Sequence, residues 1–246
     1  LGLSIQPREI KDVINDSYLN IDLKKITKSE NPEILIAGCG TGQHAITTAS
    51  KYKKSKILAL DLSFKSLSYA KRKANELKIN NIDFIQGDIL DLESIDRKFD
   101  IIESVGVLHH MNNPFKGWKI LTSCLNNDSL MLIGLYSEKA RQHIKEIKNK
   151  INKLKLPSNY KDIIKFRKDL IENNNDHWNL IKSSPDFYTV SGVRDLLFNV
   201  QERRFTISII KEYLNKLGLR FLGFEDQLIK EKFKVIYTNK DDLYNL

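Results

Sequence analysis

The densest group of residues able to bind a ligand follows an apolar run and reads Gly38-Cys-Gly-Thr-Gly42. Glycine has no Cβ, so the backbone N–H groups of such a loop can approach a bound molecule closely. Dinucleotide-binding loops carry the fingerprint G-x-G-x-x-G, but here the third glycine comes one residue early and Gln43 occupies its usual place. The shortened loop suits a ligand that has no pyrophosphate.

Two acidic residues follow the glycine loop at intervals that suit a nucleoside. Asp61 ends the next apolar run, where a carboxylate can accept hydrogen bonds from both hydroxyl groups of a ribose. Asp88 follows Gly87 after the third run, where its side chain can accept a hydrogen bond from the exocyclic amine of adenine. A glycine loop with acids at both positions is far more specific than the loop alone.

Further side chains with chemical potential come later in the chain. His109 and His110 follow a fourth apolar run, and either could take a proton from a substrate. Tyr136 and Arg141 come at the end of a fifth run and would face the same space. A polar cluster then surrounds an apolar stretch at 196–198, and it consists of Arg194, Asp195, Gln201, Glu202 and Arg204. This cluster is either a solvated helix with salt bridges or a segment that contacts the substrate.

The elements that must position these residues alternate between short β-branched runs and longer amphipathic segments. Strands are predicted at 33–37, 56–60, 81–85, 100–105 and 129–136, with two more at 219–225 and 233–237. Helices are predicted at 43–51, 63–77, 113–125 and 205–218. Strands that alternate with helices and have apolar interiors predict a parallel, doubly wound sheet covered on both faces. Ligands of such sheets bind at the carboxyl ends of the strands.

The pattern divides the chain into four predicted segments. An N-terminal helical segment covers 1–32, and a ligand-binding α/β core covers 33–136. Residues 137–204 are rich in Lys, Asn and Ile at helical spacing, which predicts a helical insertion or lid after the fifth strand. Residues 205–246 are expected to supply a helix and the last strands of the same domain.

Composition limits the class of protein. The chain has 246 residues, of which 41% are hydrophobic and 29% charged, as expected for one folded α/β domain carrying an insertion. Its two cysteines exclude a disulfide scaffold and a four-cysteine zinc site, and we predict no metal site. No apolar run reaches the roughly 18 residues of a membrane span and no signal peptide opens the chain. We expect a cytoplasmic protein and, because the chain begins at Leu1, a fragment.

The net charge of +9 first suggests an anionic partner such as nucleic acid or a membrane surface. The excess lies in two blocks, 51–80 and 137–182, which are predicted to be largely helical surface. The positions that define the expected ligand pocket are acidic or neutral. We therefore expect neither nucleic acid nor a membrane as a partner, and the sequence does not predict the oligomeric state.

The first half of the chain resembles the class I S-adenosylmethionine-dependent methyltransferases over about residues 33–136, through its glycine loop, Asp61, Gly87-Asp88-Ile89 and 104–110. The resemblance implies a Rossmann-like, mainly parallel seven-stranded sheet and S-adenosyl-L-methionine as cofactor. It implies that the loop passes the methionine part, Asp61 binds ribose, and Asp88 with Ile89 holds adenine. The cofactor contacts that it implies are Gly38, Cys39, Gly40, Gly42, Asp61, Leu62, Asp88, Ile89, Ser104 and Val105.

The second half resembles a bacterial methyltransferase subgroup that is often joined to tetratricopeptide repeats. The likeness rests on 134–141 and 193–206, and the subgroup usually has His where Asn199 and Arg203 stand here. It implies fusion to, or partnership with, a repeat domain.

We predict a methyltransferase that uses S-adenosylmethionine and acts on an unidentified small molecule or protein side chain by in-line displacement. The catalytic residue is not identified, and the candidates are His109, His110, Tyr136 and Arg141. Enzymes that methylate adenine bases or glutamine amides commonly carry an Asn/Asp-Pro-Pro-aromatic motif after the fourth strand, and 103–106 departs from it. A nicotinamide-dependent oxidoreductase and a non-catalytic cofactor-binding module are the alternatives.

Overall fold

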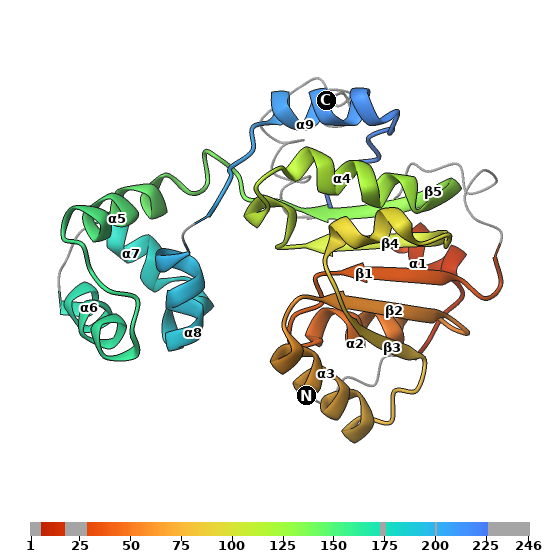
Figure 1. The fold of residues 1–246 in the computed structure, drawn as a ribbon, viewed down its shortest axis with the longest axis horizontal. Coiled ribbons are helices and arrows are strands. Elements are labelled where there is room, and N and C mark those ends of the chain that lie inside the picture. Colours follow the sequence, from red (N-terminus) through yellow and green to blue (C-terminus); the bar gives the residue numbers. More distant parts are fainter. Residues whose placement is uncertain (1–5, 18–28, 173–175, 200, 226–246) are drawn as a thin grey trace. The chain divides into compact units, whose positions relative to one another are not determined.

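The computed structural model describes residues 6–17, 29–172, 176–199 and 201–225, which form two compact units (Figure 1). Unit 1 takes in the described residues of 1–108, 113–135 and 207–246, and unit 2 takes in those of 109–112 and 136–206. Each unit buries an apolar core of its own. Within the described part of the chain, no helix combines the length and the apolar character that crossing a membrane requires.

Unit 1 is built on a sheet in which every neighbouring pair of strands is parallel, in the order β3-β2-β1-β4-β5 (Figure 1). The strands are β1 (Glu33–Ala37), β2 (Lys56–Asp61), β3 (Ile82–Gln86), β4 (Phe99–Val105) and β5 (Leu125–Gly134). The chain winds outward from β1 in one direction and then outward from β4 in the other. Parallel α/β sheets bind their ligands at such a switch point, beyond the carboxyl ends of the strands.

Helices cover both faces of this sheet. The helices of unit 1 are α1 (Ile10–Ser17), α2 (Gln43–Lys51), α3 (Phe64–Glu76), α4 (Pro114–Ser123) and α9 (Ile207–Leu217), with the short 3-10 helix η2 (Ile89–Ser94). A second 3-10 helix, η3 (Leu108–His110), begins at the last residue of this segment of unit 1 and continues into unit 2. Ile34 and Ile36 of β1 pack in one core cluster with apolar residues of α1 and α2. Leu35 points to the opposite face, because successive strand residues alternate, and it is buried there as well. The predicted doubly wound α/β architecture is therefore confirmed for these five strands.

Unit 2 is helical. Its elements are α5 (Gln142–Lys153), α6 (Tyr160–Glu172), α7 (Asp176–Lys182), the 3-10 helix η4 (Pro185–Tyr188), α8 (Val190–Val193) and the π-helical turn η5 (Arg194–Phe198). The core repeats a helical spacing, with Ile144, Ile147 and Ile151 buried on α5 and Ile163, Phe166 and Leu170 on α6. These helices lie within 137–204, where a helical insertion is expected, and its role as a lid stays a prediction.

Strand β5 differs from its prediction at both ends. It begins at Leu125 rather than at 129, and it ends at Gly134, so Tyr136 is not a strand residue. The pairing with β4 shifts register between Phe99 and Ile101, and Asp128 adopts a left-handed φ of 55°. This irregularity lets the strand pass through Asn-Asn-Asp, three residues that ordinarily indicate a turn.

The seven-stranded sheet is not confirmed, because the described residues form five strands. The predicted strand at 219–225 is absent there, and Gly223 has a φ of 134°, which interrupts the extended backbone that a strand requires. The predicted strand at 233–237 lies outside the described residues. Helix α9, which precedes both predicted strands, ends as expected, since Gly218 follows it with a left-handed φ of 67°.

Candidate functional site

The glycine loop after β1 is held by close packing. Gly38 and Gly42 have left-handed φ angles of 84° and 86°. A Cβ at Gly38 would lie 2.2 Å from Cγ2 of Val107, and a Cβ at Gly42 would lie 2.5 Å from Cβ of Ala70. Gly40 is also left-handed, but a Cβ there would meet nothing within 4 Å. Packing therefore requires the two outer glycines, and the space beside the middle one is open to a ligand.

Asp61 ends β2 and closes the glycine loop from the neighbouring strand. One carboxylate oxygen accepts the N–H of Gly40 at 2.7 Å, and the other accepts the N–H of Ser63 at 2.9 Å. An ionised carboxylate has about four acceptor positions, so this carboxylate keeps capacity for two hydroxyl groups. The structure brings Asp61 to the loop, and ribose binding stays a prediction.

Cys39 lies inside the same loop and is buried. Burial, reinforced by the negative charge of Asp61, raises the pKa of the Cys39 thiol to about 12. The thiol is therefore neutral at physiological pH, whereas a nucleophilic cysteine must be a thiolate. Cys39 is accordingly a small loop residue and not an activated nucleophile.

The residues after β2 and β3 differ in what they can offer a ligand. Asp88 begins η2 as part of a capping box, with one carboxylate oxygen accepting the N–H of Leu90 at 2.9 Å. The side chain of Ile89 is buried, so it offers a ligand almost no surface. Leu62, just beyond Asp61, is 66% exposed. The adenine role of Asp88 stays a prediction, and any contact made by Ile89 must come mainly from its backbone.

The end of β4 has one buried and one exposed candidate. The hydroxyl of Ser104 is fully buried and donates to the carbonyl of Ala37 at 3.1 Å, which ties β4 to β1. Val105 is exposed and packs beside Gly134, where an added Cβ would lie 2.7 Å from Cγ1 of Val105. Ser104 therefore holds the carboxyl ends of β1 and β4 together, and Val105 is the residue of this pair that can contact a ligand.

Strand β4 also carries a buried carboxylate that the sequence did not predict. Glu103 accepts a hydrogen bond from the Thr48 hydroxyl at 2.7 Å, and its carboxylate lies 2.8 Å from Nε2 of His44. Both partners are on α2, so the three side chains fasten that helix to the sheet. The hydrogen bond to Glu103 raises the pKa of His44 despite the opposing effect of burial. The signal was a second acid in a predicted strand, at a position between the apolar Ile102 and the buried Ser104.

The four residues proposed as catalytic candidates come together in unit 2. The rings of His109 and Tyr136 are stacked with their centres 3.6 Å apart, and the Arg141 guanidinium carbon lies 3.6 Å from the centre of the Tyr136 ring. We call His109, Tyr136 and Arg141 the aromatic column. His109 is fully buried, so its imidazole has no surface for a substrate, whereas His110 is partly exposed. His110 is therefore the better candidate for a base.

One carboxylate holds the aromatic column in place. Glu202 accepts two hydrogen bonds from the Arg141 guanidinium, at 3.0 and 2.9 Å, and one from the Lys148 ammonium at 3.0 Å. Its side chain is only 4% exposed. Burial favours a higher pKa for Glu202, but the two cations outweigh burial and lower it. The carboxylate therefore stays ionised at neutral pH.

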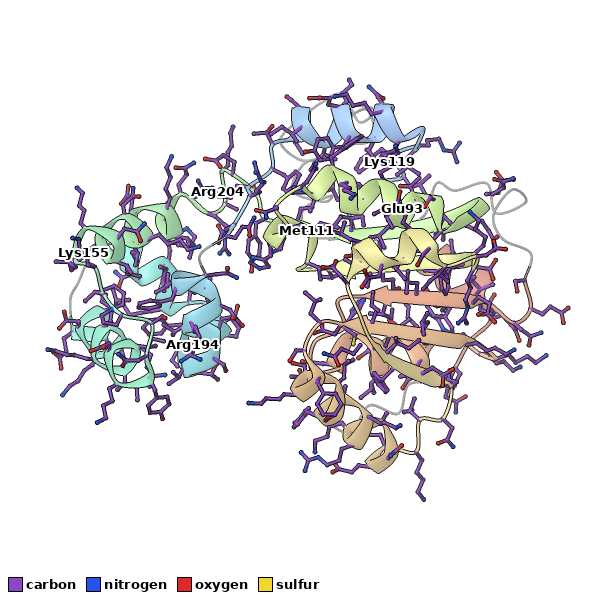
Figure 2. All side chains as sticks on the ribbon, viewed as in Figure 1. Glu93, Met111, Lys119, Lys155, Arg194 and Arg204 are labelled. Atoms are coloured by element: carbon purple, nitrogen blue, oxygen red, sulfur yellow. The ribbon has the colours of Figure 1, made fainter. Side chains whose placement is uncertain are left out.

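Other residues of this region lie either beside the histidine pair, His109 and His110, or at the exposed surface. Nδ1 of His110 lies 2.9 Å from the Gln201 carbonyl oxygen and 3.1 Å from the side-chain amide of Asn199. The N–H of Arg203 donates to the carbonyl of His109 at 2.7 Å. The positions that depart from the resembled subgroup thus both contact the histidine pair. Arg194, labelled in Figure 2, is exposed, which matches the solvated interpretation at that end.

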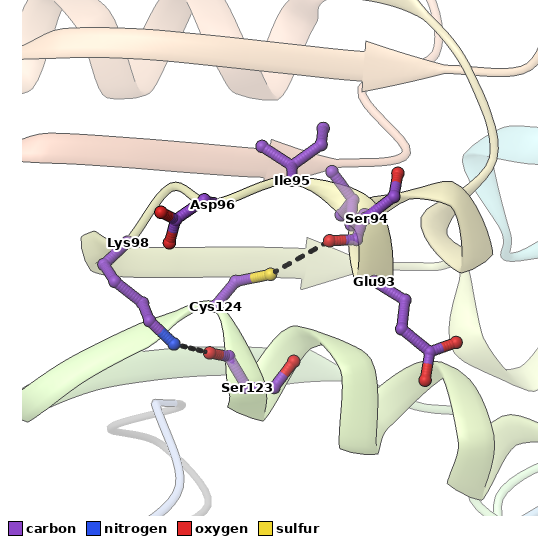
Figure 3. Close-up of a pocket in the computed structure, with 8 residues that line it drawn as sticks. Glu93, Ser94, Ile95, Asp96, Lys98, Ser123 and Cys124 are labelled. Atoms are coloured by element: carbon purple, nitrogen blue, oxygen red, sulfur yellow. Dashed lines mark hydrogen bonds between the residues drawn. The ribbon is translucent and has the colours of Figure 1, made fainter.

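A pocket of about 340 Å³ lies elsewhere in unit 1, between η2 and the end of α4 (Figure 3). The Cys124 thiol donates to the Leu92 carbonyl beside it, and Lys98 donates to the carbonyl of Ser123. Lys98 immediately precedes β4, so the pocket is at the amino end of that strand. Because ligands of parallel sheets bind at the carboxyl ends, we do not assign it to the candidate site. No group of three metal-ligating side chains forms within the described residues.

The chain resembles known proteins both in its sequence and in its fold. A family model for a methyltransferase domain matches residues 28–183. The chain is similar to syc1184_c, an uncharacterized Synechococcus sp. protein, at 28% identity over 80% of this chain and 49% of that protein. It is also similar to (S)-coclaurine N-methyltransferase of Papaver somniferum, at 28% identity over 48% of this chain and 33% of that enzyme.

Among solved structures, that of PKMT2 from Rickettsia typhi in complex with AdoHcy aligns with a TM-score of 0.65. The identity is 22%, and the alignment covers 91% of this chain and 46% of that chain. Likeness at this level of identity concerns the fold. The chain spans half or less of the length of each of these relatives.

Proposed function

The chain belongs to the methyltransferase domain family, and we propose that it transfers a methyl group from S-adenosylmethionine to a small molecule or a protein side chain. The observation that supports this best is the family match to 28–183, because that range holds all five strands and every expected cofactor contact. The activity, substrates and partners of the whole protein are part of this proposal, as are a cytoplasmic location and an association with a repeat domain.

The loop geometry supports the proposed cofactor position. The open space beside Gly40 and the spare acceptor capacity of Asp61 lie at the ends of adjacent strands, where a nucleoside can bind. We assign Asp61 to the ribose and Asp88 to adenine. When bound, the cofactor supplies a methyl group activated by its sulfonium: an acceptor lone pair forms the new bond to carbon while the carbon–sulfur electron pair stays on sulfur.

The protein must supply positioning above all. Holding the acceptor in line at near-attack distance accounts for several kcal/mol of the barrier in reactions of this type. A base is needed only where the acceptor must lose its proton first, and His110 is our candidate for that step. The stretch 103–106 lacks the motif of adenine and glutamine methylation, so we favour other acceptors.

A calorimetric titration tests the proposal directly. We expect S-adenosylhomocysteine to bind and NAD to give no response. Asp61→Ala should weaken binding by about 1.5–3 kcal/mol, the range for a lost hydrogen bond to a charged group. Asp83→Ala is the matched control, because Asp83 is an exposed acid on the neighbouring strand β3. Tight NAD binding without a response to S-adenosylhomocysteine would contradict the proposal and favour an oxidoreductase.

A second measurement separates an enzyme from a non-catalytic binding module. We expect labelled S-adenosylmethionine to transfer its label to at least one member of a panel of small molecules and proteins. The Asp61→Ala variant should lose this transfer in proportion to its lost affinity. Cofactor binding with no transfer to any acceptor would support the non-catalytic module.

A further inference from the structure

Two consecutive residues of β4 hold the two ends of the glycine loop, and all of the residues involved belong to unit 1. Glu103 and Ser104 point to opposite faces of the sheet, and both side chains are buried. Ser104 donates to the carbonyl of Ala37, the residue immediately before the loop. Glu103 contacts α2, the helix that begins immediately after the loop. Strand β4 therefore anchors the chain on both sides of the loop.

The first two turns of α2 are held by Glu103 and not by an N-terminal cap. The N-cap residue is Gly42, which has no side chain that could accept from the first N–H groups of the helix. His44 in the first turn and Thr48 in the second both contact Oε2 of Glu103, with Nε2 at 2.8 Å and the hydroxyl at 2.7 Å. Two contacts from successive turns fix both the position of the helix and its rotation.

The glycine loop can present only its backbone to a ligand at its three glycines. The N–H of Gly40 donates to Asp61 at 2.7 Å, and the N–H of Gly42 donates to the carbonyl of Cys39 at 2.9 Å. Glycine backbones are otherwise free to adopt many conformations. The shape that the loop offers a ligand therefore depends on how firmly its two ends are anchored.

His44 is the member of this anchor whose charge can change. Its Nε2 is buried against Glu103, whereas the side chain as a whole is 41% exposed, so the rest of the ring can exchange a proton with solvent. The charges that act on it are those of Glu103, Glu225 and Lys51. The hydrogen bond to Glu103 raises the pKa of His44. A protonated ring binds the carboxylate as an ion pair, which is stronger than the contact of a neutral ring.

We propose that Glu103, Ser104 and His44 are positioning residues that hold the glycine loop in the shape that binds the cofactor, and that they hold it most firmly when His44 is protonated. This inference rests on the proposed function for the identity of the ligand. The three residues act through the two ends of the loop. Affinity for the cofactor should therefore be highest below the pKa of His44 and fall as the pH rises through it.

The first test measures the loop without a ligand. Glu103→Gln should speed hydrogen exchange of the Gly42 amide by about 10-fold relative to the amides of β1, because the loop opens locally once its anchor is weakened. Asp100→Asn is the matched control, since Asp100 is also a buried acid of β4 but accepts the N–H of Glu33, at the end of β1 away from the loop. It should leave this ratio unchanged. An unchanged ratio in Glu103→Gln, or an equal increase in both variants, would overturn the inference.

The second test measures affinity for S-adenosylhomocysteine by calorimetry between pH 6 and 8. Wild-type affinity should fall with rising pH by up to about 10-fold, the scale on which residues without ligand contact modulate binding. His44→Gln should bind with an affinity that does not change with pH, and Asp100→Asn should keep the wild-type profile. A pH-independent wild type, or a His44→Gln variant that keeps the decline, would overturn the role of His44. A wild type that binds no S-adenosylhomocysteine at any pH would contradict the proposed function instead.

Discussion

The two units hold their functional carboxylates in different ways. Asp61 of unit 1 is half-buried and accepts hydrogen bonds from two backbone N–H groups. Glu202 of unit 2 is almost fully buried and binds two side-chain cations, Arg141 and Lys148. The position of Asp61 therefore depends on the path of the backbone, whereas the position of Glu202 depends on charge pairing between distant parts of the chain. Substitutions and pH should affect the two units differently.

The largest effect should follow the removal of the carboxylate in unit 2. Glu202→Ala leaves Arg141 and Lys148 without their shared partner in a buried site. Breaking a buried ion pair in this way costs about 3–5 kcal/mol of stability. Hydrogen exchange of the α5 amides should report the loss. Glu138→Ala is the control, because its pair with Arg204 is more exposed and contributes about 1 kcal/mol or less.

The pH dependence of this contribution sharpens the comparison. The pKa of Glu202 is lower in the folded protein than its ordinary value of 4.5. Its contribution is therefore fully present above pH 4.5 and is lost as the pH falls through the folded pKa. Acid should weaken wild-type unit 2 and leave the Glu202→Ala variant less affected. Equal acid sensitivity in the two proteins would contradict the role of the ion pairs.

Next in size is a backbone effect in unit 1. Gly38→Ala places a Cβ against Val107 at a left-handed residue, and we expect it to cost about 3–4 kcal/mol through strain and overpacking. Gly40→Ala is the matched control, since its Cβ meets nothing and the left-handed backbone alone costs about 1–2 kcal/mol. Urea unfolding measures both. Equal losses would show that packing at Gly38 is unimportant.

A smaller effect is expected at the cluster that fastens α2 to the sheet. His44→Ala removes one partner of the buried Glu103, and because His44 is 41% exposed we expect a loss of about 1–3 kcal/mol, less than for a fully buried pair. The hydrogen bond to Glu103 raises the pKa of His44 above 6.5. This stabilisation is thus full below pH 6.5 and is lost as the pH rises through the folded pKa.

The His44 prediction is checked by urea unfolding between pH 5 and 9. Besides Glu103, the charges that act on His44 are those of Glu225 and Lys51, so salt should change the transition only modestly. Unit 1 should lose stability toward alkali and unit 2 toward acid. A His44→Ala variant that keeps the alkaline decline of the wild type would refute the assignment to this residue.

The smallest effect should come from Cys39. Its thiol pKa of about 12 keeps it neutral, so a thiol reagent at pH 8 should not modify it in the folded protein. Cys39→Ser should change the affinity for S-adenosylhomocysteine by less than about 1 kcal/mol, because it alters no charge and little volume. Rapid labelling of Cys39 would show that the loop opens.

The sequence could predict most of unit 1 because its signals are local. The glycine spacing, the apolar strands and the acids at strand ends each concern a few neighbouring residues. Ser63, the first residue of the helix predicted at 63–77, accepts the N–H of Ser66 at the start of α3. The predicted extent of β5 was wrong, because a β-bulge carries that strand through residues that usually form a turn.

The arrangement of unit 2 could be predicted only as a list of residues. His109, His110, Tyr136 and Arg141 stand out in the sequence as catalytic candidates, but their stacking depends on segments about 30 residues apart. The role of Glu202 depends on a partner 61 residues away. Glu103 was missed for a similar reason, since its partner Thr48 is 55 residues distant and on another element. Periodicity and motif spacing carry no information over such separations.

The division into units has a consequence for how this protein can be cut or recombined. The chain passes between the units after 108, 112, 135 and 206, so unit 2 is not one contiguous stretch. A fragment limited to 136–206 would keep Tyr136 and Arg141 but lack His109, which covers the other face of the ring. Exchanging that stretch between related proteins would separate residues that must fit one another. Residues 136–206 therefore cannot be exchanged alone, and residues 109–112 after β4 must be exchanged together with them.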